Sequence, residues 1–161
     1  MVRWTVAMPL DPHALHLAIR WLHVVAMATA FGGAITVFAL SARTRNGALD
    51  AALVEVALRY EFLFWLAAGI LAMTGIGNLA AFGSGLPLSR TEWGTTFVLK
   101  LGFVIALIVL SLPRTLAIAR LQRSRSRPLS APLQGRLRMM YGGTGAAFAV
   151  ALGLAVWLAR G

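Results

Sequence analysis

Residues 15–40 read LHLAIRWLHVVAMATAFGGAITVFAL, a run that is apolar over most of its length and carries one charged residue, Arg20. A helix needs about 20 mostly apolar residues to cross the hydrocarbon core of a bilayer, and this run exceeds that length. It is also too long for the core of a signal peptide, and it lacks a convincing cleavage site of small residues. We therefore interpret it as a retained membrane-spanning helix.

Three further runs have the same character, and the breaks between them contain residues typical of loops, such as the Gly-Ser-Gly-Leu-Pro stretch at 83–87. These loops are too short to hold a second domain. The predicted fold is therefore all-α, an integral membrane four-helix bundle formed by a single transmembrane domain over residues 1–161. Its helices are expected at about 15–40, 56–82, 93–118 and 139–158.

The composition excludes an ordinary soluble domain. The chain is 59% hydrophobic and 12% charged, whereas soluble domains have about 25% charged residues. A net charge of +10 would suggest a nucleic-acid-binding protein on a soluble fold, but most of the basic residues lie between apolar runs, at 43–59 and 114–138. We therefore expect the lipid bilayer, including its anionic lipids, as the partner, and no nucleic acid. The absence of cysteine excludes a thiolate metal site.

The loop charges predict the orientation. The first and third loops carry nearly all of the loop arginines, so both termini are expected outside a bacterial inner (cytoplasmic) membrane. Glu55, Arg59 and Glu61 are assigned to the inner end of the second helix, with Glu55 and Arg59 as a surface ion pair. Arg114 and Arg120 are assigned to the inner end of the third helix, where long side chains can snorkel to lipid phosphates.

The functional candidates are the ionisable residues inside the spans, because such residues are rare within membranes. His23 and Lys100 are expected at similar depth in the outer half of the bilayer. On the first helix, five residues follow at intervals of three or four and form one stripe: His13, His16, Arg20, His23 and Met27. The second helix brings Met73, Thr74 and Asn78 toward the same level.

A pocket with imidazole, thioether, amide and ammonium groups could hold a haem iron or Cu(I). The predicted cofactor-binding residues are His23, Lys100, Met73, Asn78 and Arg20, and the predicted metal ligands are His23, Met73 and Met27. Plainer interpretations stay open: solvated imidazoles at His13 and His16, a snorkelling Lys100, and methionines that only fill the core. The chain has no HExxH zinc motif and no P-loop, and no serine is expected near His23, which argues against a hydrolase.

Several short motifs resemble one family. Leu22-His23 and Phe31-Gly32-Gly33, then Thr74-Gly75-Ile76-Gly77-Asn78, Gly83, Thr91, Trp93-Gly94 and Leu99-Lys100-Leu101, resemble the pattern of the CopD-like (copper resistance D) membrane proteins. His23 and Lys100 also match the first-helix histidine and third-helix lysine of the HemJ-like four-helix protoporphyrinogen oxidases, which use haem b.

The resemblance implies a redox metal centre, haem b or copper, around His23, for electron transfer or copper handling. Two alternatives stay open. One is a HemJ-like protoporphyrinogen oxidase. Because this alternative is catalytic and the others are not, the sequence leaves open whether the chain is an enzyme. The other is a non-catalytic accessory subunit, packed through small residues such as Gly145, Ala149 and Gly153 on a membrane protein partner or on further copies of itself.

Overall fold

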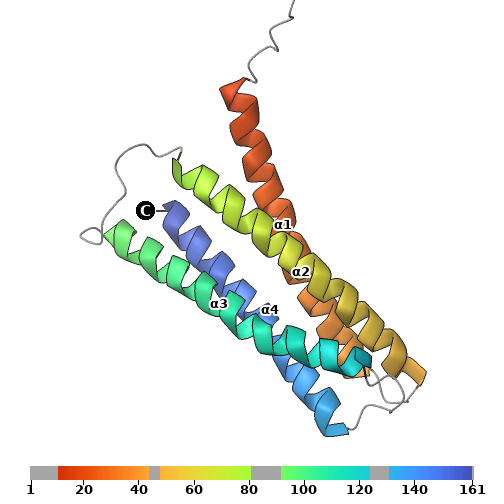
Figure 1. Ribbon diagram of the computed structural model, residues 1–161. Coiled ribbons are helices and arrows are strands. Elements are labelled where there is room, and N and C mark those ends of the chain that lie inside the picture. The colour runs from red at the N-terminus through yellow and green to blue at the C-terminus, as the bar shows by residue number, and fades with distance from the viewer. Residues whose placement is uncertain (1–10, 44–47, 81–91, 124–130, 161) are drawn as a thin grey trace, which may run out of the picture.

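The structure, a computed structural model, describes residues 11–43, 48–80, 92–123 and 131–160, which are almost entirely helical. The four helices are α1 (Pro12–Arg43), α2 (Ala48–Ala80), α3 (Glu92–Arg123) and α4 (Ala131–Arg160) (Figure 1). Each contains a segment long and apolar enough to cross a membrane, and no described residue belongs to a strand. The predicted all-α membrane bundle of four helices is confirmed.

The helices are longer than the apolar runs that predicted them. α2 begins at Ala48 instead of about residue 56, and α4 begins at Ala131 instead of about residue 139. These added turns carry charged residues such as Glu55 and Arg136. An apolar run marks only the length inside hydrocarbon, while the helix itself is held by backbone hydrogen bonds that continue into the headgroup region.

The helices form a four-membered arrangement in which α1 and α3 lie on a diagonal. α1 packs against α2 and α4, and α3 packs against α4 and least extensively against α2, while the described parts of α1 and α3 make no close backbone approach. We call the end where α1 begins and α4 ends the terminal end, and the opposite end, which carries Arg43 and Arg123, the arginine end. At the terminal end the first turns of α1 lean away from the other helices (Figure 1).

The contact between α1 and α2 depends on small residues. Ala26, Ala30 and Ala34 are buried along α1, which lets the backbones approach closely. A Cβ placed on Gly33 would lie 2.5 Å from Cδ2 of Tyr60, so the Tyr60 ring lies directly against the α1 backbone. The Tyr60 hydroxyl donates a hydrogen bond to the Ala30 carbonyl at 3.1 Å. Tyr60 therefore joins the two helices by both shape and hydrogen bonding.

Burial along α3 is uneven, and this positions the candidate site. Ser111, Arg114 and Ile118 are buried toward the arginine end, whereas no residue from Phe97 to Leu110 is buried. The bundle is therefore tightly packed near the arginine end and more open around the terminal half of α3.

Candidate functional site

His23 lies about three turns from the start of α1 and is half-buried. Its Nδ1 atom lies 2.7 Å from Oγ1 of Thr74, a buried residue on α2. An imidazole inside an apolar span needs such a partner, because an unsatisfied polar group is costly there. The bond also holds the ring in one orientation between α1 and α2.

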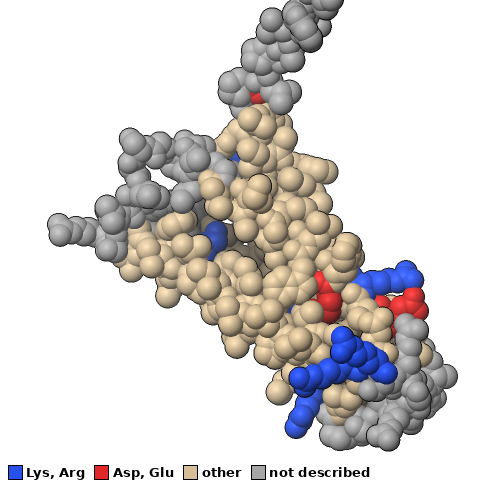
Figure 2. Space-filling model, in the orientation of Figure 1, with Lys and Arg blue, Asp and Glu red and all other residues tan. Residues whose placement is uncertain are grey.

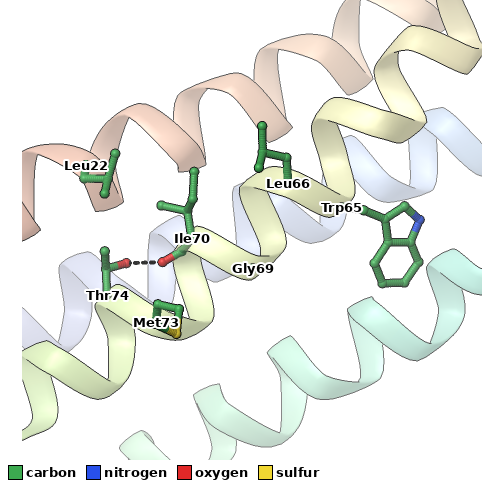
Figure 3. A pocket seen from close by; sticks show the side chains of 7 residues that line it. All are labelled: Leu22, Trp65, Leu66, Gly69, Ile70, Met73 and Thr74. Atoms are coloured by element: carbon green, nitrogen blue, oxygen red, sulfur yellow. Dashed lines mark hydrogen bonds between the residues drawn. The ribbon is translucent and has the colours of Figure 1, made fainter.

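The contacts of Thr74 offer an arrangement of hydrogen bonds that leaves Nε2 of His23 free to act as a ligand. The Thr74 hydroxyl donates to the Ile70 carbonyl at 2.7 Å, the bond drawn in Figure 3. A hydroxyl has one proton, so when that proton goes to Ile70, Thr74 Oγ1 accepts a hydrogen bond from Nδ1–H of His23. In the neutral imidazole, Nε2 then has the lone pair that can bind a metal, the arrangement typical of metal-ligating histidines.

Lys100 lies in the terminal half of α3 and is half-buried. α3 lies diagonally opposite α1, and the described parts of these two helices make no close backbone approach. The structure therefore places Thr74 against His23, and places Lys100 in the same terminal half of the bundle on the diagonally opposite helix.

The remaining predicted residues are more dispersed. Arg20 is exposed, about one turn from His23 toward the terminal end. Met27 is partly buried and packs against the hydrophobic core, which is its plainer role. Met73 is 75% exposed. The side chain of Asn78 lies outside the described part of the structure.

Met73 and Thr74 line an apolar hollow of about 330 Å³ between α1 and α2 (Figure 3). This is near the lower end of the range of about 300–1,000 Å³ for small-molecule pockets. The other residues that line it are Leu22, Trp65, Leu66, Gly69 and Ile70. His23 and Lys100 do not line the hollow, but Thr74 belongs to it and bonds His23, so the hollow and the imidazole are neighbours.

The metal-binding side chains limit which redox centre fits. Within the described ranges, no three His, Cys, Asp or Glu residues are placed to hold a metal ion together. A copper ion would then rest on His23 and on thioethers such as that of Met27. Haem iron takes four nitrogens from its macrocycle and needs only axial ligands from the protein. A single histidine with Nε2 available therefore suits haem better than copper.

A second polar cluster lies deeper in the bundle, centred on Glu61 of α2 and Arg114 of α3. Their side chains are 6% and 2% exposed, and Arg114 Nε donates to Glu61 Oε1 at 2.7 Å. Arg114 Nη2 donates to the other carboxylate oxygen at 3.2 Å, which makes the pair bidentate. The prediction that Arg114 snorkels to lipid phosphates is wrong, because Arg114 is buried and finds its counter-charge inside the bundle. The exposed Glu55–Arg59 pair, at 2.6 Å, is confirmed.

The neighbours of this pair satisfy its remaining hydrogen-bonding capacity. Tyr141 of α4 donates to Glu61 Oε1 at 2.8 Å, and Thr115 donates to Glu61 Oε2. Arg114 Nη1 donates to Thr144 at 2.6 Å, and the guanidinium carbon lies 4.5 Å from the centroid of the Phe64 ring. The cluster ties α2, α3 and α4 together and leaves little capacity for a ligand, so we assign it to the architecture.

A sequence signal for this cluster existed. Glu61 and Arg114 both fall within the predicted spans 56–82 and 93–118, more than one turn from the nearer end. Opposite charges inside two spans are expected to pair, because an unpaired charge in hydrocarbon is strongly unfavourable.

In comparisons with known proteins, no family model, no curated protein and no solved structure matches the chain.

Proposed function

We propose that this chain is an integral membrane protein that holds haem b on His23, for electron transfer. The observation that carries the proposal is the contact between Nδ1 of His23 and Oγ1 of Thr74, which leaves Nε2 of a membrane-embedded imidazole available as a ligand. When bound, haem supplies an iron that exchanges one electron between its ferrous and ferric states.

Other features of the same region support the proposal. Thr74 holds the imidazole by its second nitrogen, a contact that raises the basicity of a ligating histidine. Lys100 and Arg20 provide cations near the terminal end, suited to the carboxylates of a porphyrin. The absence of buried residues between Phe97 and Leu110 means that the α3 face near Lys100 is not closed by packing.

The test is cofactor analysis of the full chain purified in detergent from membranes, comparing wild type with His23→Ala and His16→Ala. His16 is a matched control, because it lies two turns from His23 on the same side of α1, and no bond to Thr74 is present there. We expect a Soret band and stoichiometric haem in wild type and His16→Ala, and loss of both in His23→Ala.

A second outcome is that wild type contains copper and shows no Soret band. If His23→Ala loses that copper, the site is retained and its metal is copper instead of haem. Neither cofactor in wild type, together with a stoichiometric partner protein, would instead favour the accessory-subunit interpretation. Haem retained by His23→Ala would contradict the proposal.

Porphyrinogen oxidation is a second candidate, favoured by the half-buried Lys100 in the same half of the bundle as His23. In that case Lys100→Ala abolishes turnover of protoporphyrinogen while haem is retained, and Lys100→Arg restores part of the turnover. Haem without turnover in wild type leaves electron transfer as the function.

A further inference from the structure

The arginine end of the bundle carries five exposed arginines on three helices. We call them the arginine cluster: Arg43 on α1, Arg120 and Arg123 on α3, and Arg136 and Arg138 on α4. Figure 2 shows the blue side chains of Lys and Arg gathered at this end of the molecule. No salt bridge joins any of the five to the acidic side chains that the structure describes, those of Asp11, Glu55 and Glu61. The cluster is therefore a cationic surface without a described protein counter-charge.

Three acidic side chains are described and all three are committed elsewhere, while the side chains of Asp50 and Glu92 lie outside the described part of the structure. Glu61 is buried with Arg114, Glu55 bonds Arg59 at 2.6 Å, and Asp11 lies at the terminal end, where it caps the start of α1. None of these three carboxylates is therefore available as a counter-ion for the arginine cluster.

The register between the helices puts the cluster in the last two or three turns at the arginine end. Arg114 contacts Thr144, so moving six residues from each toward the arginine end, about 9 Å, reaches Arg120 and Arg138. On the other side of α4, Gln134 donates a hydrogen bond to the Ser41 carbonyl, two residues before Arg43. The guanidinium groups of α1, α3 and α4 thus lie near the helix ends, where lipid headgroups are found.

Arg138 is held in place by its neighbours. Its guanidinium carbon lies 5.6 Å from the centroid of the Phe38 ring of α1. That ring is fixed in turn against Gly142 of α4, where an added Cβ would lie 3.0 Å from Phe38 Cε2. A guanidinium that contacts an aromatic ring in this way keeps N–H groups for contact with a phosphate.

Apolar side chains accompany these cations. Leu40 of α1 directly precedes Ser41, and Met139 of α4 directly follows Arg138. Their side chains are 38% and 75% exposed. A cationic site bordered by exposed apolar side chains matches a molecule with a phosphate head and acyl chains better than it matches free phosphate.

We propose that the junction of α1 and α4 at the arginine end is a binding site for an anionic phospholipid. Arg138 and Arg43 bind the phosphodiester, while the acyl chains lie along the apolar surface that includes Leu40 and Met139. Arg120, Arg123 and Arg136 add to the positive potential and favour headgroups with two phosphates. This site is independent of the function proposed for His23.

The experiment places the purified full chain in nanodiscs of phosphatidylcholine with or without a small fraction of cardiolipin or phosphatidylglycerol. Lipid retention is measured by native mass spectrometry and Tm by thermal unfolding, for wild type, for the double variant Arg43→Gln/Arg138→Gln, and for Arg59→Gln. Arg59 is the matched control, because it is an arginine near the same end whose charge is already paired with Glu55.

We expect wild type and Arg59→Gln to retain the anionic lipids and to gain Tm with them. The double variant should bind them about tenfold more weakly. Its Tm in pure phosphatidylcholine should equal that of wild type, which shows that it folds. The proposal would be overturned if wild type retained phosphatidylcholine as well as it retains the anionic lipids, or if Arg59→Gln lost lipid binding as much as the double variant does. It would also be overturned if inorganic phosphate raised Tm as much as the anionic lipids do.

Discussion

At the scale of single residues, the Thr74 hydroxyl decides what His23 can do. Thr74→Val keeps the shape of the side chain but removes the oxygen that accepts from Nδ1–H. Loss of such an outer partner typically weakens metal binding by about 10–100-fold, so haem retention should fall by that factor. Titration of the apoprotein with haem, followed at the Soret band, measures it.

Thr29→Val is the control for that substitution, because Thr29 is an exposed threonine whose hydroxyl bonds only the Val25 carbonyl within its own helix. Equal haem affinity in both variants would show that Thr74 does not orient the ligand.

Gly33 and Gly32 are adjacent in sequence, but they differ sharply in the space available for a Cβ atom. In Gly33→Ala the new Cβ meets the Tyr60 ring at 2.5 Å, so α1 and α2 have to separate or the ring has to move. Overpacking of this kind destabilises by about 1–3 kcal/mol. Gly32→Ala meets no atom within 4 Å and should be neutral. Unfolding in detergent measures both, and similar free energies of unfolding for the two variants would contradict the close α1–α2 contact.

At the scale of helices, the Glu61–Arg114 pair is the main polar link from α2 to α3. Glu61→Gln leaves a buried guanidinium without its counter-charge, which costs about 3–5 kcal/mol. The double variant Glu61→Leu/Arg114→Met should be less destabilised than either single variant, because it leaves no unpaired charge. A double-mutant cycle on the free energy of unfolding in detergent measures this coupling.

Glu55→Gln provides the comparison on the same helix. Its pair with Arg59 is exposed, so its loss should change stability by about 0–1 kcal/mol. A similarly small change in Glu61→Gln would mean that the buried pair does not hold α2 to α3.

At the scale of the whole molecule, the distribution of arginines predicts that the arginine end faces the cytoplasm and the terminal end faces outward. The chain has no cysteine, so single cysteines report topology without background. A membrane-impermeant maleimide should label Ala14→Cys in intact cells, and Ala42→Cys only after the membrane is opened. Both positions are exposed in the bundle, at opposite ends of α1. The reverse labelling pattern would invert the orientation.

The sequence by itself determined the number of helices, because each span requires a long apolar run whatever its neighbours are. It also identified His23 and Lys100, since ionisable groups inside such runs stand out without any knowledge of packing.

Only the tertiary structure decided which polar groups pair. The Thr74 contact with His23 and the Glu61–Arg114 pair join residues more than 50 positions apart, and they depend on the rotation and register of helices. Apolar periodicity cannot supply that rotation here, because lipid-facing and core-facing residues are equally apolar. Small residues and buried hydrogen bonds set it instead, as Gly33 against Tyr60 and Tyr141 bonded to Glu61 illustrate.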